Sequence, residues 1–322
     1  MNVLNFMSLF NKVKYKLVSY GTIALTKFVC LFKSYPLDKS MMIFGEPRSG
    51  TTWLMELLSN YKKCIVIWEP LNPRHGVVPV NLKNETRIFE NPGNKSSLLE
   101  KFIIDVLTLK KINSWTMNYA TLTSILSSSN TLTKFVRGTL LLPWITDIFS
   151  FAYKPVFIIR HPIAMTLSQM KGALDIKKEM MSSSVFKCIY PSRHEEYQTF
   201  INGLNSELER LVAMWCLYHK YILDFQNQKG TLIVIFYEDL LVNPKEELRK
   251  IISSWKLDLH IDSLDLRKPS QSDFSKQLKA DPMAQLTKWQ QELSLDEISD
   301  VQSILDYFEI GIYNSHSVLP VK

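Results

Sequence analysis

The stretch that most constrains the fold is an apolar run, a short loop and an apolar periodic segment over residues 41–54. The run Met41-Met-Ile-Phe44 stops at Gly45, and a segment with helical spacing begins at Thr51. This order predicts a strand, a tight loop and a helix over 51–60. Backbone N–H groups at the start of such a helix, aided by the helix dipole, form an anion site. The sequence therefore predicts a strand–loop–helix unit that holds an oxyanion.

One position of this loop departs from the phosphate-binding loop of nucleotide-binding proteins. Gly45 and Gly50 have the spacing of the pattern G-x-x-x-x-G-K-[ST], but Thr51 stands where that pattern has lysine. The cation of the loop is instead Arg48. We therefore expect the loop to bind an anion without gripping a triphosphate in the usual way.

The eight residues Glu-Pro-Arg-Ser-Gly-Thr-Thr-Trp at 46–53 resemble the 5′-phosphosulfate loop of the sulfotransferases, which use 3′-phosphoadenosine 5′-phosphosulfate (PAPS). The resemblance covers roughly residues 40–260. It implies an α/β fold, a three-layer sandwich with a central parallel sheet and a P-loop-like phosphosulfate loop. It also implies that PAPS is bound by Arg48, Ser49, Gly50, Thr51, Thr52 and Trp53. Arg48 would in addition stabilise the leaving phosphate, as a catalytic residue.

Two later stretches are similar to the part of the family that binds the 3′-phosphate of PAPS. Arg160 follows the apolar run 155–159, and Ser168 lies two helical turns further on. A guanidinium can clamp a phosphate in a two-pronged fashion, although Arg160 alone is also consistent with a structural salt bridge. Arg267 and Lys268 resemble the family's cofactor-covering loop, and a solvated charge pair explains them equally well.

The resemblance also names a candidate for the general base. Cytosolic members use a histidine after a lysine on the third strand, and the comparable stretch 134–137 contains Lys134 but no histidine. Golgi carbohydrate and tyrosyl-protein members use a glutamate after the second strand, which Trp68-Glu69-Pro70 resembles. Glu69 is therefore the candidate catalytic base. The alternative is that Glu69 only caps the strand or pairs with Arg48.

The chain alternates apolar runs of strand length with segments of helical period. We expect strands at 41–44, 64–68, 131–136, 155–159 and 231–236. We expect helices at 51–60, 97–111, 206–226, 244–255, 284–292 and 295–308, and one ending near Ser168. We expect residues 72–96 to form a long irregular segment that binds substrate, and residues 176–203 to form a loop. Such alternation predicts a parallel sheet with helices on both faces and ligands at the carboxyl ends of the strands.

The net charge of +7 is unevenly placed along the chain. Residues 1–37 hold five of the 38 basic residues and no acid, so the remaining 33 basic residues face 31 acidic ones. A nearly neutral body argues against a nucleic-acid partner. We divide the chain into a basic amphipathic segment, 1–37, and a sulfotransferase domain, 38–322. The segment either rests on a membrane surface or packs on the domain. Four widely spaced cysteines favour a reducing, cytoplasmic location, with membrane association possible.

The implied function is transfer of a sulfuryl group from PAPS to a hydroxyl-bearing acceptor, with no metal required. The acceptor is a carbohydrate or other small alcohol, and glycans, glycolipids and small molecules all stay open. Residues 72–120 and 171–205 are expected to line its site, with Trp68, Trp115 and Tyr119 suited to stacking on a sugar. The rivals are a P-loop kinase or NTPase, which lacks the phosphate-binding lysine, and an inactive membrane-associated binder.

Overall fold

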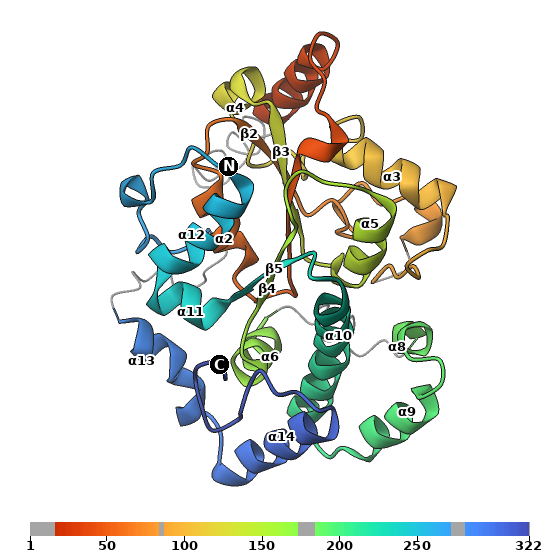
Figure 1. Ribbon diagram of the computed structural model, residues 1–322, viewed down its shortest axis with the longest axis vertical. Coiled ribbons are helices and arrows are strands. Elements are labelled where there is room, and N and C mark those ends of the chain that lie inside the picture. The colour runs from red at the N-terminus through yellow and green to blue at the C-terminus, as the bar shows by residue number, and fades with distance from the viewer. Residues whose placement is uncertain (1–16, 84–86, 173–183, 272–280, 322) are drawn as a thin grey trace, which may run out of the picture.

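The computed structural model describes residues 17–83, 87–172, 184–271 and 281–321, and there it shows a five-stranded parallel sheet with helices on both faces (Figure 1). The spatial order of the strands is β2-β3-β1-β4-β5. Their bounds are β1 Ser40–Phe44, β2 Cys64–Trp68, β3 Asn130–Phe135, β4 Val156–Ile159 and β5 Ile233–Phe236. The predicted three-layer α/β fold is confirmed, and the predicted strands differ from the observed bounds by at most two residues.

Both faces of the sheet are buried because successive strand residues point to opposite sides. Met42 and Phe44 of β1 pack into one core cluster, whereas Met41 and Ile43 pack into the other. The first cluster is covered by α3 (Ser97–Leu107), α5 (Leu142–Ile148), α6 (Pro162–Met170), α10 (Glu207–Lys229) and α14 (Leu295–Tyr307). The second is covered by α2 (Thr51–Leu58), α11 (Tyr237–Val242) and α12 (Pro244–Trp255).

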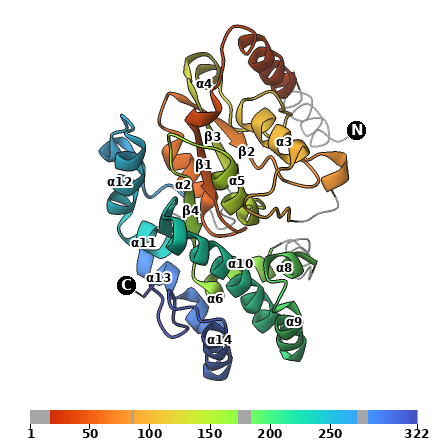
Figure 2. The same ribbon diagram turned by 45° about the vertical axis from the view of Figure 1, so that its right-hand side comes forward.

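The prediction of a loop over 176–203 is wrong where the structure describes this region. Helices α8 (Ser184–Ile189) and α9 (His194–Gly203) lie there (Figure 2). The sequence of α9 has few apolar residues, so its period is weak. Tertiary contacts fix it instead, since Phe200 stacks on Tyr307 at 3.7 Å between ring centroids and Tyr197 lies 5.2 Å from Phe308. Residues 176–183 of this prediction lie outside the described residues.

Short helices account for the other differences. The segment 284–292 is divided into α13 (Pro282–Leu286) and a 3₁₀ turn, η5 (Lys288–Gln291). Helices α4 (Leu122–Ser127), α5 and α11 were not expected, because six or seven residues are too few to establish a helical period. The longest helix, α10, begins as its sequence indicates, with a capping box between Ser206 and Glu209, and ends at Gly230 in the left-handed region.

The N-terminal segment is helical over residues 17–29. The apolar face expected for this amphipathic segment includes Val3, Phe6, Phe10 and Val13. These four residues lie outside the described residues. Among the residues that the structure describes, we find no helix of the length and apolar character that crossing a bilayer requires.

A buried ion pair anchors the loop after β1 to the rest of the domain. Arg87 donates from Nη1 to Glu46 Oε1 at 2.7 Å, and both side chains are fully buried. The Arg87 guanidinium also lies 4.8 Å from the ring centroid of Tyr218 on α10. Removing one member of such a pair leaves an uncompensated charge in the interior. The irregular excursion 72–96 thus supplies a structural contact that its sequence did not indicate.

We predict that Arg87→Met lowers the free energy of unfolding by about 3–5 kcal/mol, because it leaves the Glu46 carboxylate buried without its cationic partner. Urea denaturation measures the change. Adding Glu46→Gln recovers part of the loss, since an amide is cheaper to bury than a charge. Lys245→Met is the control, because it breaks an exposed ion pair with Asp262 and costs little. A loss in Arg87→Met no larger than in this control would contradict the prediction.

Candidate active site

The loop between β1 and α2 has two residues in the left-handed region, Arg48 at φ 74° and Gly50 at φ 95°. Such a conformation is costly for arginine, so surrounding contacts must hold it. Gln169 donates to the Pro47 carbonyl at 2.8 Å, and Arg160 donates from Nη1 to the Arg48 carbonyl at 2.9 Å. The loop backbone is therefore fixed by side chains from β4 and α6.

The start of α2 presents backbone N–H groups that have no partner within the helix. The first N–H groups of any helix lack intrahelical partners, and Gly50, as the N-cap residue, has no side chain to satisfy them. A Cβ on Gly50 would lie 2.4 Å from the Tyr237 ring, so the close packing of α11 against the loop requires glycine. The expected anion-binding geometry of loop and helix is present.

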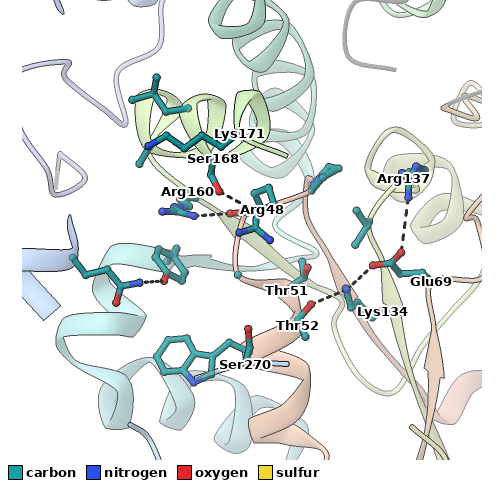
Figure 3. Close-up of a pocket in the computed structure, with 18 of the residues that line it drawn as sticks. Arg48, Thr51, Thr52, Glu69, Lys134, Arg137, Arg160, Ser168, Lys171 and Ser270 are labelled. Carbon is teal, nitrogen blue, oxygen red and sulfur yellow. Dashed lines mark hydrogen bonds and ion pairs between the residues drawn. The ribbon is translucent and has the colours of Figure 1, made fainter. Parts of the chain in front are cut away.

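Arg160 and Ser168, two predicted residues from later parts of the chain, contact Arg48 of this loop (Figure 3). Arg48 Nε donates to Ser168 Oγ at 2.9 Å, and Arg160 contacts the Arg48 carbonyl. The Arg160 guanidinium lies 4.7 Å from the Tyr237 ring centroid, while its Nε is buried without a hydrogen bond to the described residues. An unsatisfied guanidinium donor beside a serine hydroxyl suits an anionic ligand.

Glu69 and Lys134 form a second polar group at the carboxyl ends of β2 and β3. Lys134 Nζ donates to Glu69 Oε1 at 2.7 Å and to Thr52 Oγ1 at 2.9 Å, and Arg137 Nη1 lies 3.9 Å from Glu69 Oε2 (Figure 3). Burial lowers the pKa of Lys134, and the Glu69 carboxylate opposes that shift. Lys134 thus links the candidate base to the first turn of α2.

The aromatic side chains beside Glu69 are already packed against other groups. Lys134 Nζ lies 3.5 Å from the ring centroid of Trp68, and Tyr119 stacks on the same indole at 4.6 Å. A cation and a stacked ring at these distances must occupy opposite faces of the indole. Trp68 lines the cavity described next but has no free face for a sugar, whereas Trp115 and Tyr119 do not line it.

A cavity of about 510 Å³ joins the two polar groups. Most of the predicted site residues line it: Arg48, Gly50, Thr51, Thr52, Trp53, Glu69, Arg160 and Ser168. Ser49 does not, because it is buried with its hydroxyl against Gly45. Arg267 and Lys268 are exposed and lie outside the lining, whereas the neighbouring Ser270 belongs to it.

The cavity also has lining residues that were not expected from the sequence. Tyr237, the first residue of α11, packs against Gly50 and against the Arg160 guanidinium. The other lining residues that no prediction named are Pro47, Val136, Arg137, Ala164, Leu167, Gln285, Lys288, Trp289 and Glu292. Asn72 and Lys171 also line the cavity, and they fall within the ranges 72–120 and 171–205 expected to line the acceptor site. Lys171 Nζ is bonded to Glu292 at 2.6 Å, which links the end of α6 to η5. The period of residues 284–292 indicated a helix but gave no sign of a place in the site, and only tertiary packing brings residues 285–292 to the cavity.

Buried groups behind Arg160 hold the carboxyl end of β4. The backbone N–H of His161 donates to Glu238 Oε1 at 2.9 Å, and the Tyr313 hydroxyl donates to Glu238 Oε2 at 2.6 Å. Burial lowers the pKa of His161 to about 4, so its imidazole is neutral near pH 7. His161 stacks on Trp289 at 4.8 Å and serves a structural role, as its place before a proline indicated.

Within the described ranges, no cluster of three or more His, Cys, Asp or Glu side chains has the arrangement of a metal site.

Comparison with solved structures returns sulfotransferase folds at low sequence identity. The sulfotransferase domain from the curacin biosynthetic pathway is 16% identical, with 84% of this chain and 96% of that chain covered and a TM-score of 0.46. The sulfotransferase domain of the Synechococcus PCC 7002 olefin synthase is 17% identical, with 84% and 94% covered and a TM-score of 0.43. A retinol dehydratase in complex with retinol and PAP is 12% identical, with 86% and 83% covered and a TM-score of 0.37.

No protein of curated function matches the sequence significantly. A sequence model described as the sulfotransferase family matches residues 41–261, which is more than half of the chain and includes the loop, Glu69, Arg160 and Ser168. The resemblance inferred from the motifs is confirmed, and the chain belongs to the sulfotransferase family.

Proposed function

We propose that this sulfotransferase moves the sulfuryl group of PAPS to the hydroxyl of a carbohydrate or other small alcohol, with Glu69 as the base. The observation that carries the proposal is one cavity that joins the loop of Arg48, the Arg160–Ser168 pair and Glu69. Titration of PAP, the desulfated product, by calorimetry tests the donor half. A screen of acceptors with labelled PAPS tests the other half.

The residues present fit the two charged ends of PAPS. Arg48 and the N–H groups at the start of α2 suit the 5′-phosphosulfate, because they combine a cation with backbone donors that have no partner within the helix. Arg160, with its buried and unsatisfied Nε, and Ser168 suit the 3′-phosphate. Trp53 also lines the cavity and makes an edge contact with Tyr237 at 6.2 Å between ring centroids, and it offers an apolar surface for the adenine. We place Arg267 and Lys268 at the outer side of the same nucleotide.

In the proposed mechanism, Glu69 and the basic residues have separate tasks. The donor supplies a sulfuryl group bound to a phosphate that can leave. Glu69 accepts the proton of the acceptor hydroxyl while that oxygen bonds to sulfur. We assign this task to Oε2, because Lys134 holds Oε1 at 2.7 Å whereas Arg137 Nη1 lies at the longer distance of 3.9 Å from Oε2. The bond from sulfur to the phosphate oxygen breaks, and Arg48 and the loop amides stabilise the charge left on that oxygen.

The lining of the cavity on the acceptor side is polar. Asn72 and Arg137 lie beside Glu69 and offer hydrogen-bond donors, which supports an acceptor with several hydroxyl groups. Recognition would therefore use hydrogen bonds rather than stacking, since both faces of Trp68 are covered. One of the compared structures is a retinol dehydratase in complex with retinol and PAP, and its ligands do not identify the acceptor of this chain.

A kinase or NTPase is not favoured. Thr51 stands where the phosphate-binding lysine of those proteins lies. The family match and the Arg160–Ser168 pair are both left unexplained by that alternative.

We further propose a cytoplasmic location. None of the four cysteines, all of which lie within the described residues, forms a disulfide, and Cys64 and Cys216 are buried, which supports a reducing compartment.

Arg48→Ala is predicted to lower turnover about 10²–10³-fold, since it removes fixed positive charge from the leaving phosphate. Steady-state assay with labelled PAPS measures the loss. Arg249→Ala, at an exposed position on α12, is the matched control and keeps normal turnover. Near-normal turnover in Arg48→Ala would refute the role given to this residue.

Glu69→Gln is predicted to lower kcat about 10²–10⁴-fold and to spare PAP affinity, because glutamine keeps the shape of the side chain but cannot take a proton. Kinetics and calorimetry measure the two quantities. Glu56→Gln is the control, since Glu56 lies on α2 and bonds Tyr119 outside the cavity lining. Unchanged turnover in Glu69→Gln would mean that another group is the base.

Ser168→Ala is predicted to weaken PAP binding about tenfold, because a hydrogen bond to a charged phosphate is lost. The affinity for adenosine 5′-monophosphate, which lacks the 3′-phosphate, should stay unchanged. Calorimetry with both nucleotides on both proteins measures the difference. Equal losses for the two nucleotides would place Ser168 away from the 3′-phosphate.

A further inference from the structure

An apolar surface lies at the amino ends of β2 and β3, in a part of the molecule that sulfuryl transfer does not use. In both views α4 lies beside the helix of residues 17–29, at the end of the molecule away from α14 (Figures 1 and 2). Large exposed apolar side chains gather on these two segments. We call them the amino-end patch: Leu17, Val18, Tyr20, Phe28, Leu31, Phe32, Leu122 and Leu126.

The N-terminal helix has two apolar sides. On one side Thr26 is 1% exposed, and Leu25, Val29 and Cys30 pack against the domain core. Leu17, Tyr20 and Phe28 lie on the opposite side of the helix, and Leu31 (75% exposed) and Phe32 (79% exposed) follow in the turn after it. A helix that only packs on its own domain needs one apolar side. The exposed apolar side of the helix therefore indicates a second binding partner outside the domain.

The two parts of the patch are held together. Lys33 Nζ donates to the Leu126 carbonyl at 3.2 Å, and the buried Tyr35 hydroxyl donates to the Ile125 carbonyl at 3.4 Å. Phe28 and Phe32 make an edge contact at 5.4 Å between ring centroids. Because these contacts fix the end of the helix on α4, the patch is one continuous surface.

The charged residues of the segments that form the patch are all lysines. Lys27 and Lys33 lie within it, and Lys62 and Lys63 adjoin α4, since Ser127 Oγ donates to the Lys62 carbonyl at 3.2 Å. The segments 17–37, 61–63 and 121–130 contain no aspartate or glutamate. A second copy of the chain would bring lysines against lysines, which disfavours self-association. An anionic surface matches both the charge and the apolar side chains.

We propose that the amino-end patch binds an anionic lipid bilayer, with its apolar side chains at the level of the headgroups and its lysines on acidic headgroups. The catalytic cavity lies at the carboxyl ends of the strands, at the opposite edge of the sheet, so lipid contact leaves the cavity accessible. The proposal goes beyond the sulfotransferase reaction and does not depend on it.

Co-sedimentation of the full chain with vesicles tests the proposal. We expect binding to vesicles of phosphatidylcholine with phosphatidylserine, weaker binding to phosphatidylcholine alone, and loss of binding as salt screens the lysines. The triple variant Lys27→Glu, Lys62→Glu, Lys63→Glu should weaken binding about a hundredfold, at about fivefold per lysine. Leu31→Ser with Phe32→Ser should weaken it about tenfold or more.

Matched variants away from the patch are the controls. Leu295→Ser on α14 and Lys187→Glu on α8 change an exposed leucine and an exposed lysine, and both should bind vesicles as the unmodified chain does. Thermal melting checks that the patch variants fold. The proposal is overturned if the unmodified chain ignores phosphatidylserine vesicles or if the patch variants bind as tightly as the controls. It is also overturned if ultracentrifugation shows a dimer that Phe32→Ser dissociates.

Discussion

The site depends on how the backbone of the loop after β1 is held. Its left-handed residues would be strained in an isolated chain, but Gln169 and Arg160 bond the carbonyls of Pro47 and Arg48. The ion pair of Glu46 with Arg87 fixes the start of the same loop. The donors at the start of α2 are therefore oriented before any ligand arrives, and such preorganisation is what makes fixed charges effective in catalysis.

Lys134 connects the two halves of the site. Its ammonium contacts Glu69, Thr52 and the Trp68 ring, so the residue after β2, the first turn of α2 and the aromatic cluster share one buried charge. A buried lysine is costly unless it is paired, and its three contacts offset that cost. The same contacts orient the carboxylate that we propose as the base.

The family match ends at residue 261, yet the cavity is completed by residues beyond it. Trp289 stacks on His161, and Tyr313 bonds Glu238, so the C-terminal segment supports the end of β4 that carries Arg160. Glu292 reaches Lys171 on α6. The C-terminal segment, which lies beyond the family match, therefore forms one wall of the site.

The sequence by itself determined the five strands, the long helices and the loop with Arg48, because period, apolar runs and glycine spacing are local properties. The family motifs added Glu69, Arg160 and Ser168, which all line the cavity. Only the tertiary structure decided the rest: α9, whose few aromatic residues gain their role by stacking on α14, the wall at 285–292, and the covered faces of Trp68. Each of these depends on contacts between residues far apart in the chain, and no local pattern records such contacts.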